Sequence, residues 1–227
     1  NMDLALAYRL HAKLAAQGKP LQPWQIQALT HACRDAKEQL LADAGAHSVP
    51  IVVPSRGSKL IGATLSTELT RTEVEETLVD GFFPVVSIDE HPVQQARGAL
   101  TQMGLPYAQD AAVTRHLAAF LCRQAGALGD EGDFIAPTAV LFNGGVLKAP
   151  LLAQRLMAVL NDWLEQGDAP AARLLGGADL DLAVARGAAY FGNVRQGRGV
   201  RIRGGIASAY YVGIESAMPA VPGMPPM

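Results

Sequence analysis

Gly144 and Gly145 are the residues of this chain best suited to hold a ligand, because they separate a run of aliphatic residues from a helix that begins at Pro150. Adjacent glycines let a flat ligand approach the backbone, since no Cβ atom intervenes and positive φ angles are allowed. The N-terminus of the following helix adds free N–H groups and a partial positive charge. A tight turn without a ligand is the simpler interpretation of the same residues. The spacing of a phosphate-binding P-loop, Gly-x-x-x-x-Gly-Lys-Ser/Thr, is absent.

Charged residues at two other places could add specificity to such a site. One group is Arg34, Lys37, Glu38 and Leu41 on a predicted helix, whose spacings of three, four and seven positions bring the side chains close together on one face. Asp179 and Asp181 precede a run of small residues at 183–189, and Asp181 could equally serve only as the cap of its helix. A solvated charged face is the simpler interpretation of the helix residues, which are Arg34, Lys37, Glu38 and Leu41.

Other chemistries find no support in the sequence. The five histidines have no metal-ligand spacing and belong to no Ser/His/Asp set, so we predict neither a metal site nor a catalytic residue. The arginine-rich segment 195–203 lacks interleaved aromatic residues, and the net charge of −2 provides no attraction to nucleic acid or to an anionic membrane. No apolar run approaches the roughly 18 residues of a membrane-spanning helix. Neither nucleic acid nor membrane is therefore expected as a partner.

The composition is that of a folded protein with a surplus of core-forming residues. The 227 residues suffice for one large or two small domains, and 49% are hydrophobic while only 18% are charged, against about 25% charged in a typical domain. Cys33 and Cys122 both lie in apolar helical patterns and are predicted to be buried free thiols in a reducing compartment. The first residues lack the basic start and apolar core of a secretory signal, so we expect a cytoplasmic protein.

The elements that must position the candidate site begin with two helices. Residues 3–17 and a segment that begins at Pro23 are predicted to be helical and to pack as an antiparallel pair. Apolar residues at spacings of three and four positions should form one buried seam on the second helix. These residues are Ile26, Leu29, Cys33, Ala36 and Leu40.

A β-hairpin and a third helix are predicted next. Two β-rich runs, residues 49–53 and 60–65, flank a predicted turn at 56–58. Thr70 and Glu73 match a capping box, so a helix should begin there. The residues that this helix should turn inward are Val74, Leu78 and Phe82.

Prolines and glycines interrupt residues 84–109, where a short helix near 93–103 is expected. Asp110 is predicted to cap the helix that follows, and residues 126–137 form a predicted loop. The apolar residues that define this helix are Val113, Leu117, Phe120 and Leu121.

After the loop, strands and helices alternate. Thr138–Phe142 is predicted as a short buried strand and Arg173–Leu175 as a second, with helices at Pro150–Leu164 and Asp181–Val194. Strands alternating with helices of this length indicate a parallel sheet. Ala209–Ile214 is a further predicted strand.

Five segments of the chain, taken in order, resemble the seventy-kilodalton heat-shock chaperones of the DnaK type. They are similar to that family's adenosine-side helix, the helix start after its hairpin, its strand–Gly-Gly–helix element, its helix of small residues after an aspartate, and a later strand. The segments are Ala28–Leu40, Leu69–Glu75, Val140–Pro150, Asp181–Ala189 and Tyr211–Glu215. The resemblance covers most of residues 1–216, and residues 84–109 depart from it as an insertion.

The resemblance implies an α/β fold of the actin-like ATPase (ribonuclease H-like) class, and specifically an incomplete lobe II of its nucleotide-binding domain. Residues 1–125 would form the upper subdomain, with a helix pair, a β-hairpin and further helices. Residues 126–216 would form a βαβα piece of the mixed sheet in the lower subdomain. The proline-rich residues 217–227 would form a tail or linker.

The same resemblance places the ATP or ADP of a full-length parent between the upper helix and the Gly-Gly turn. Lys37 would contact the ribose, and Lys148 stands where the family has an arginine beside the adenine. The same matching places Asp181 among the binding residues. The base and sugar would be lined by Gly144, Gly145 and Val146.

The chain also departs from the family's pattern. The family's glutamate and arginine on the upper helix are Arg34 and Glu38 here, so the charges are exchanged, and two of its serines are replaced by Leu41 and Val146. A guanidinium stacks on adenine, which the carboxylate of Glu38 cannot do. Phosphoryl transfer depends on phosphate loops, a metal-positioning aspartate and a catalytic lysine, and this sequence has no counterpart of them. We therefore expect weak or no ATP binding and no hydrolysis by this chain alone.

The expected function is that of a fragment of a divergent ATP-dependent chaperone. Its expected partners are the missing lobe I and C-terminal region of the same protein, unfolded polypeptides and co-chaperones. A non-enzymatic scaffold or regulator with a degenerate actin-like fold is the alternative, and a small-molecule kinase of the same superfamily is a further one. In such a fragment, the surplus of apolar residues predicts an apolar surface that the absent partners would cover. This exposed surface in turn predicts self-association of the chain.

Overall fold

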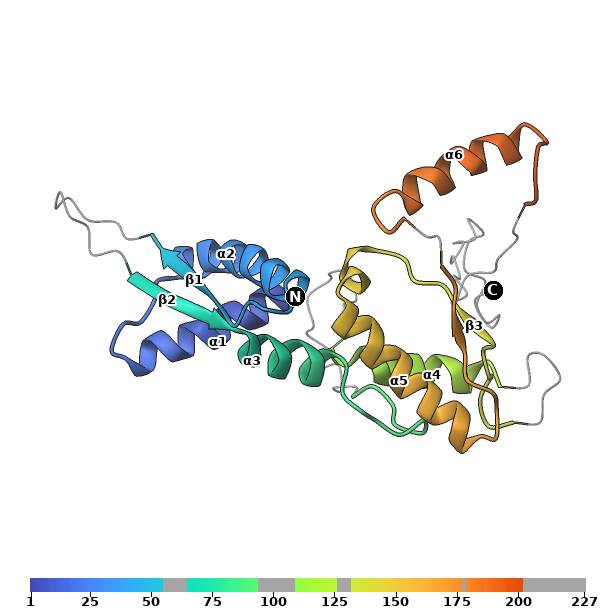
Figure 1. The fold of residues 1–227 in the computed structure, drawn as a ribbon, viewed down its shortest axis with the longest axis horizontal. Helices are drawn as coiled ribbons and strands as arrows, with labels where there is room; N and C mark the ends of the chain where they lie inside the picture. Colours follow the sequence, from blue (N-terminus) through green and yellow to red (C-terminus); the bar gives the residue numbers. More distant parts are fainter. Residues whose placement is uncertain (55–64, 94–108, 126–131, 177–178, 202–227) are drawn as a thin grey trace, which may run out of the picture. The chain divides into compact units, whose positions relative to one another are not determined.

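The structure is a computed structural model, in which the described residues form a mixed α/β protein with two small sheets (Figure 1). The chain separates into two compact units, Asn1–Ala183 and Val184–Met227. The predicted subdomains 1–125 and 126–216 and the predicted tail 217–227 stay predictions. The described residues are 1–54, 65–93, 109–125, 132–176 and 179–201.

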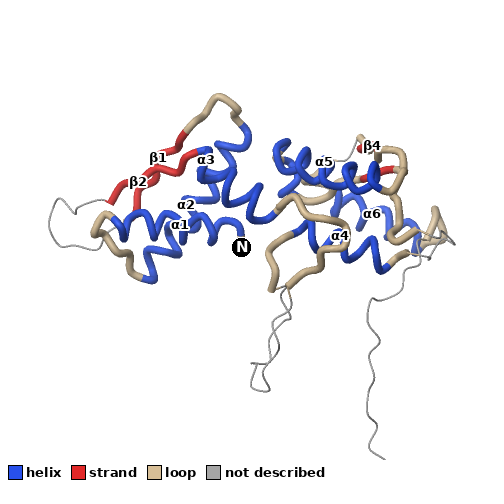
Figure 2. Tube along the Cα trace, turned by 90° about the horizontal axis from the view of Figure 1, so that it is seen from below, coloured by secondary structure: helices blue, strands red, loops and turns tan. Residues whose placement is uncertain are grey.

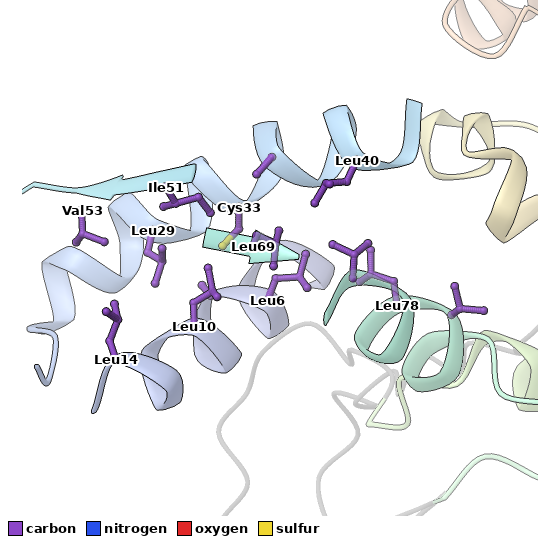
Figure 3. Packing of buried hydrophobic residues seen from close by; sticks show 14 of the residues in the cluster. Leu6, Leu10, Leu14, Leu29, Cys33, Leu40, Ile51, Val53, Leu69 and Leu78 are labelled. Atoms are coloured by element: carbon purple, nitrogen blue, oxygen red, sulfur yellow. The ribbon is translucent and has the colours of Figure 1, made fainter. Parts of the chain in front are cut away.

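Helices α1 (Met2–Ala16) and α2 (Pro23–Ala42) form the predicted antiparallel pair (Figure 1). Their leucines interdigitate along the pair, together with the buried Cys33, as Figure 3 shows. The predicted seam on α2 is wrong at one position, because Ile26 is only half-buried and Gln25 is buried instead. Gln25 tolerates burial because its amide donates to the carbonyl of Pro54 (2.9 Å) and its oxygen accepts from the backbone of Gln22 (2.9 Å).

Strands β1 (Ser48–Val53) and β2 (Leu65–Thr70) pair antiparallel, with Ser48 opposite Thr70, and confirm the predicted hairpin. The hairpin lies along one side of the helix pair (Figure 2). The second strand extends five residues beyond its predicted end, because Leu65, Thr67 and Leu69 alternate inward although the residues between them are polar. The predicted turn at 56–58 and the start of the predicted strand at Leu60 lie outside the described residues.

The capping box at Thr70 is confirmed. The Thr70 hydroxyl accepts from the Glu73 N–H (3.2 Å), and the Glu73 carboxylate accepts from the Thr70 N–H (2.8 Å). Helix α3 (Arg71–Val74) then continues as a π-helical turn, η1 (Glu75–Asp80). A π turn holds one extra residue, so the inward position moves one residue along the chain. Phe82, predicted inward, is only half-buried, and Phe83 takes its place in the core.

Helix α4 (Val113–Arg123) confirms the predicted helix but not its details. Ala112, and not Asp110, is the residue that precedes the first turn of the helix. The Asp110 carboxylate instead accepts from the Ala112 N–H (2.8 Å) and the Val93 N–H (2.9 Å). Of the four predicted residues, Leu121 is buried and Leu117 is half-buried against the second core, whereas Val113 and Phe120 are exposed. The inward face of the helix also includes Thr114 and Ala118. The helix expected near 93–103 lies almost entirely outside the described residues.

The alternation of strands and helices after residue 137 is confirmed. β3 (Ala139–Val140) and β4 (Arg173–Leu174) pair in parallel, and α5 (Pro150–Gln166) connects them. The first strand is shorter and less buried than predicted, since Leu141 is 61% exposed. Helix α6 (Ala183–Arg195) follows near the predicted bounds, while the strand predicted at 209–214 lies outside the described residues. None of the helices in the described part combines the length and the hydropathy that crossing a bilayer requires.

Two cores hold the first unit together. The first gathers α1, α2, both strands of the hairpin and the α3–η1 segment, and it also takes Leu152 from the first turn of α5. The second gathers α4 and the C-terminal half of α5, including Leu160 and Trp163, against Val86 and Ala172. Helix α5 therefore belongs to both cores.

Cys33 in the first core makes unfolding depend on pH at alkaline values. Burial, followed by the charges of Asp3 and Glu73, raises the pKa of this thiol from 9.0 to about 12. Above pH 9 the unfolded chain loses a proton that the folded chain keeps, so the free energy of unfolding should fall by about 1.4 kcal/mol for each pH unit from this residue. Urea unfolding of the wild type and of Cys33→Ala between pH 8.5 and 10.5 measures the difference. Equal slopes for the two proteins would contradict a thiol that stays protonated.

Cys122 is a free thiol too but is only partly buried, which corrects the prediction for that residue.

Candidate functional site

A cavity of about 690 Å³ lies within the first unit. Its walls come from the start of α1, the C-terminal half of α2, the single 3₁₀ turn η2 (Gly145–Lys148), the first turn of α5, and Asp181. The lining residues are Met2, Asp3, Arg34, Lys37, Glu38, Leu41, Ala42, Gly145, Val146, Lys148, Ala149, Leu152 and Asp181. Seven of the eight predicted binding residues are among them, and the eighth, Gly144, immediately precedes the wall.

Helix α2 supplies one wall through residues on the face that the sequence singled out. The Lys37 ammonium forms an ion pair with Asp3 of α1 (Nζ–Oδ1 2.5 Å), and both side chains are largely buried. Arg34 forms an ion pair with Glu38 one turn along (Nε–Oε1 3.2 Å), and both side chains are mostly exposed. Lys37 is therefore held in place by tertiary structure, whereas Arg34 and Glu38 restrain one another at the rim.

The Gly-Gly turn forms the opposite wall, and its two glycines have different roles. Gly144 has a φ of 85°, a conformation that side chains rarely adopt, and its N–H donates to the Asn143 side chain (2.8 Å). Gly145 has no such constraint, and a Cβ atom placed on it would meet no atom within 4 Å. Gly144 thus shapes the turn, while the missing side chain of Gly145 leaves open space in the cavity.

Lys148 and Asp181 close a third side of the cavity. Their ion pair (Nζ–Oδ2 2.6 Å) joins residues 33 positions apart, and the hydrogen bond that the Lys148 ammonium donates to the Asp181 carboxylate raises the pKa of Lys148. The backbone N–H groups of Asp181 and Leu182 donate to the Asp179 carboxylate (3.1 and 3.2 Å). Asp179, and not Asp181, therefore accepts the backbone N–H groups at this turn, and the Asp181 carboxylate pairs with Lys148 at the cavity.

The charges that line the cavity balance one another. Each of its three cations pairs with a carboxylate of the same cavity, in the pairs Lys37–Asp3, Arg34–Glu38 and Lys148–Asp181. The remaining lining side chains are aliphatic, and the set includes no serine, cysteine or histidine that could act as a nucleophile or general base. Within the described ranges, no group of three or more His, Cys, Asp or Glu side chains could hold a metal ion. The arrangement suits a small ligand without net charge that has both hydrogen-bonding and apolar groups.

Sequence reasoning missed the contribution of α1. Met2 and Asp3 line the cavity, and Asp3 is the partner of Lys37, 34 positions away. An acidic residue in the first turn of a helix is ordinarily explained by the helix dipole, so its type alone carries no sign of a binding site. The antiparallel packing of α1 against α2 brings it there.

No family model matches the chain, and no curated protein matches it significantly.

Proposed function

We propose that this chain is part of lobe II of an actin-like ATPase domain from a divergent DnaK-type chaperone, and that it supplies the adenosine-binding half of the nucleotide cleft. The observation that carries the proposal is the meeting of three resembling segments in one cavity. Ala28–Leu40 provides the helix wall, Val140–Pro150 the glycine wall and Asp181–Ala189 the carboxylate of the third side. These segments are distant in the sequence, and the fold brings all three to the same cavity.

The size and lining of the cavity support a nucleoside as the ligand. A volume of about 690 Å³ lies within the range of small-molecule sites, about 300–1,000 Å³. In this proposal the adenine lies against the open space at Gly145 and Val146, and the Lys37 ammonium donates to a ribose hydroxyl. Lys148 and Asp181 together offer a donor and an acceptor to the edge of the base.

Phosphate chemistry belongs to other parts of the parent protein in this proposal. The sequence has no phosphate loop, and transfer of a phosphoryl group requires positioned charges around the phosphates and a metal ion. This chain therefore binds ATP or ADP weakly and does not hydrolyse ATP alone. The parent would be cytoplasmic and would couple nucleotide binding in the joined lobes to the handling of unfolded polypeptides with co-chaperones.

A non-enzymatic scaffold is the second candidate, and the charge pairing in the cavity favours it. Arg34 is held by Glu38, and neither lies free for adenine stacking. Leu41 and Val146 replace hydroxyl groups with aliphatic side chains at the cavity wall. A scaffold would keep the fold of the cavity without any nucleotide affinity.

Titration with adenosine and ATP, followed by saturation-transfer NMR, separates the two candidates. We expect adenosine to bind with a Kd of about 1 mM, corresponding to about −4 kcal/mol. Gly145→Val should weaken binding at least tenfold without unfolding the chain, because its side chain enters the open space of the cavity. Gly176→Val is the matched control, since a Cβ there also meets no atom within 4 Å and Gly176 does not line the cavity.

Three results would contradict the proposal. Absence of adenosine binding at about 10 mM, ten times the expected Kd, would support the scaffold. Equal weakening by the variants at Gly145 and Gly176 would place any binding outside this cavity. ATP turnover that copurifies with the chain and survives removal of contaminants would contradict the absence of phosphoryl transfer.

A further inference from the structure

Asp3 and Lys37 form the least exposed of the three ion pairs that line the cavity. Their side chains are 30% and 16% exposed, whereas every side chain of the other two pairs is at least half exposed. Water and salt screen an exposed pair, so its charges act only weakly on a ligand. The Asp3–Lys37 pair is screened less, because the uncharged side chains that line the cavity are aliphatic. This pair therefore has the strongest electrostatic effect on a ligand inside the cavity.

The same pair keeps hydrogen-bonding capacity for a ligand. The Lys37 ammonium has three N–H donors, and in the described part of the chain it uses one of them, toward Asp3 Oδ1 (2.5 Å). The Asp3 carboxylate accepts this bond and, among these residues, no other, although its two oxygens offer about four acceptor positions. A ligand in contact with the pair can therefore accept from Lys37 and donate to Asp3 through neighbouring atoms. Two hydroxyl groups on adjacent carbons, as in ribose, have this arrangement.

We infer that Asp3 is a specificity-determining residue of this cavity: its carboxylate accepts from a ribose hydroxyl beside Lys37 and excludes a ligand that carries a phosphate at that position. The inference rests on the proposed function, in which Lys37 donates to a ribose hydroxyl. A phosphate on the 2′ or the 3′ oxygen lies next to the carboxylate, and like charges repel strongly where burial limits screening. The 5′ carbon lies on the other side of the sugar, so a phosphate there is tolerated.

The chemistry of this selection is known from other sites. In dinucleotide-binding folds a carboxylate accepts from an unmodified ribose hydroxyl, whereas a nearby cation accommodates a phosphate on the same oxygen. This cavity contains both kinds of group, and the carboxylate of Asp3 holds the ammonium of Lys37. Lys37 without Asp3 would attract a phosphate, because an ammonium is a common phosphate-binding group. The specificity thus includes a repulsive element as well as an attractive one.

Saturation-transfer NMR of the full chain with adenosine and its 2′-, 3′- and 5′-monophosphates tests the inference. We expect the 5′-monophosphate to bind the wild type within about threefold of adenosine. The 2′- and 3′-monophosphates should bind about tenfold more weakly or worse, because their phosphate meets the Asp3 carboxylate. The three monophosphates carry the same charge, so general attraction to the chain, or repulsion from it, does not account for a difference between them.

Two variants and a control assign the rejection to Asp3. Asp3→Asn should abolish the rejection of the 2′- and 3′-monophosphates, because Lys37 then faces the ligand without a carboxylate. The double variant Asp3→Asn with Lys37→Met should also abolish it, and this variant leaves no unpaired charge in the cavity that could prevent folding. Asp35→Asn is the matched control, since Asp35 is an exposed carboxylate on the same helix and does not line the cavity. The rejection should persist in this control.

Inorganic phosphate provides a second readout, which needs no nucleoside. An anion that binds the folded chain raises the free energy of unfolding as its concentration increases. At matched ionic strength, with chloride as the reference, phosphate should stabilise Asp3→Asn more than the wild type. The double variant lacks Lys37 and should respond to phosphate as the wild type does. An ion pair that only fastens α1 to α2 predicts the same response in all of these proteins.

The results separate failure of the inference from failure of the proposed function. Wild-type chain that binds adenosine and its 2′- and 3′-monophosphates equally well would overturn the inference and leave nucleoside binding intact. Rejection that persists in both Asp3 variants, or that Asp35→Asn abolishes as well, would overturn it equally. A phosphate response of Asp3→Asn that equals that of the wild type would contradict an anion position at Lys37. Absence of binding by adenosine and by every monophosphate would refute the proposed function, and the inference with it.

Discussion

Trp163→Ala should lower the free energy of unfolding by about 3–5 kcal/mol, which approaches the whole stability of many domains. Trp163 is fully buried at the centre of the second core, between α4 and α5. Its indole N–H donates to the carbonyl of Val86 (2.7 Å). Truncation therefore leaves a large cavity and also deprives a buried carbonyl of its partner. Urea unfolding followed by far-UV circular dichroism measures the loss.

Two further variants separate the packing of Trp163 from its hydrogen bond. Trp163→Phe keeps much of the ring volume but leaves the Val86 carbonyl unpaired, so it should cost about 1–3 kcal/mol. Phe120→Ala, on the exposed side of α4, should change stability by no more than about 0.5 kcal/mol. If Trp163→Ala is no more destabilising than Phe120→Ala, the second core does not hold the first unit together.

Arg71→Met should destabilise the chain by about 2–4 kcal/mol, because the Arg71 side chain serves three backbone carbonyls at the end of α2. Its guanidinium donates to Leu40 (2.6 Å), to Asp43 (2.5 Å) and to Ala46 (3.0 Å). The last carbonyls of a helix have no partners within the helix, so methionine would leave the Leu40 carbonyl unsatisfied, whereas the Asp43 carbonyl would keep the N–H of Ala46 (3.2 Å). Arg71→Lys should recover only part of the loss, since one ammonium cannot reach all of these carbonyls in a fixed geometry.

The Arg71 variants also bear on the candidate site. The α2 turn that Arg71 holds lies directly after Lys37 and Glu38 and includes Leu41, which line the cavity. Hydrogen exchange should accelerate in residues 37–43 of Arg71→Met, and adenosine binding should weaken with it. Arg123→Met is the control, since the bond that Arg123 donates among the described residues stays within its own helix, to the Ala119 carbonyl (3.1 Å). If exchange at the end of α2 is unchanged, Arg71 does not anchor this wall of the cavity.

The local parts of the site could be predicted from residue types over short distances. The capping box at Thr70 and Glu73 acts within four residues, and it forms as predicted. The Gly144–Gly145 turn needs a positive φ at one position, which glycine allows at little cost. The residues on α2 share a face because helical geometry alone sets their spacing.

Other parts depended on how the elements pack. Phe83 replaces Phe82 in the core because a π turn shifts the phase of the helix, and no residue type announces such a turn. The inward face of α4 is that of Thr114 and Ala118, since small side chains allow close approach and Thr114 donates to the Pro84 carbonyl (2.8 Å). Apolar periodicity correctly placed Leu117 and Leu121 toward the core but wrongly added Val113 and Phe120, which are exposed.

By itself the sequence determined most of the helices, the hairpin, the parallel strands and the Arg34–Glu38 pair one helical turn apart, because caps, periodicity and glycine turns act between near neighbours. Only the tertiary structure decided that Lys37 and Lys148 each meet a carboxylate of the same cavity, and that Asp3 is one of these. Such contacts join residues tens of positions apart, so they depend on the packing of whole elements, and no local pattern of residue types encodes them.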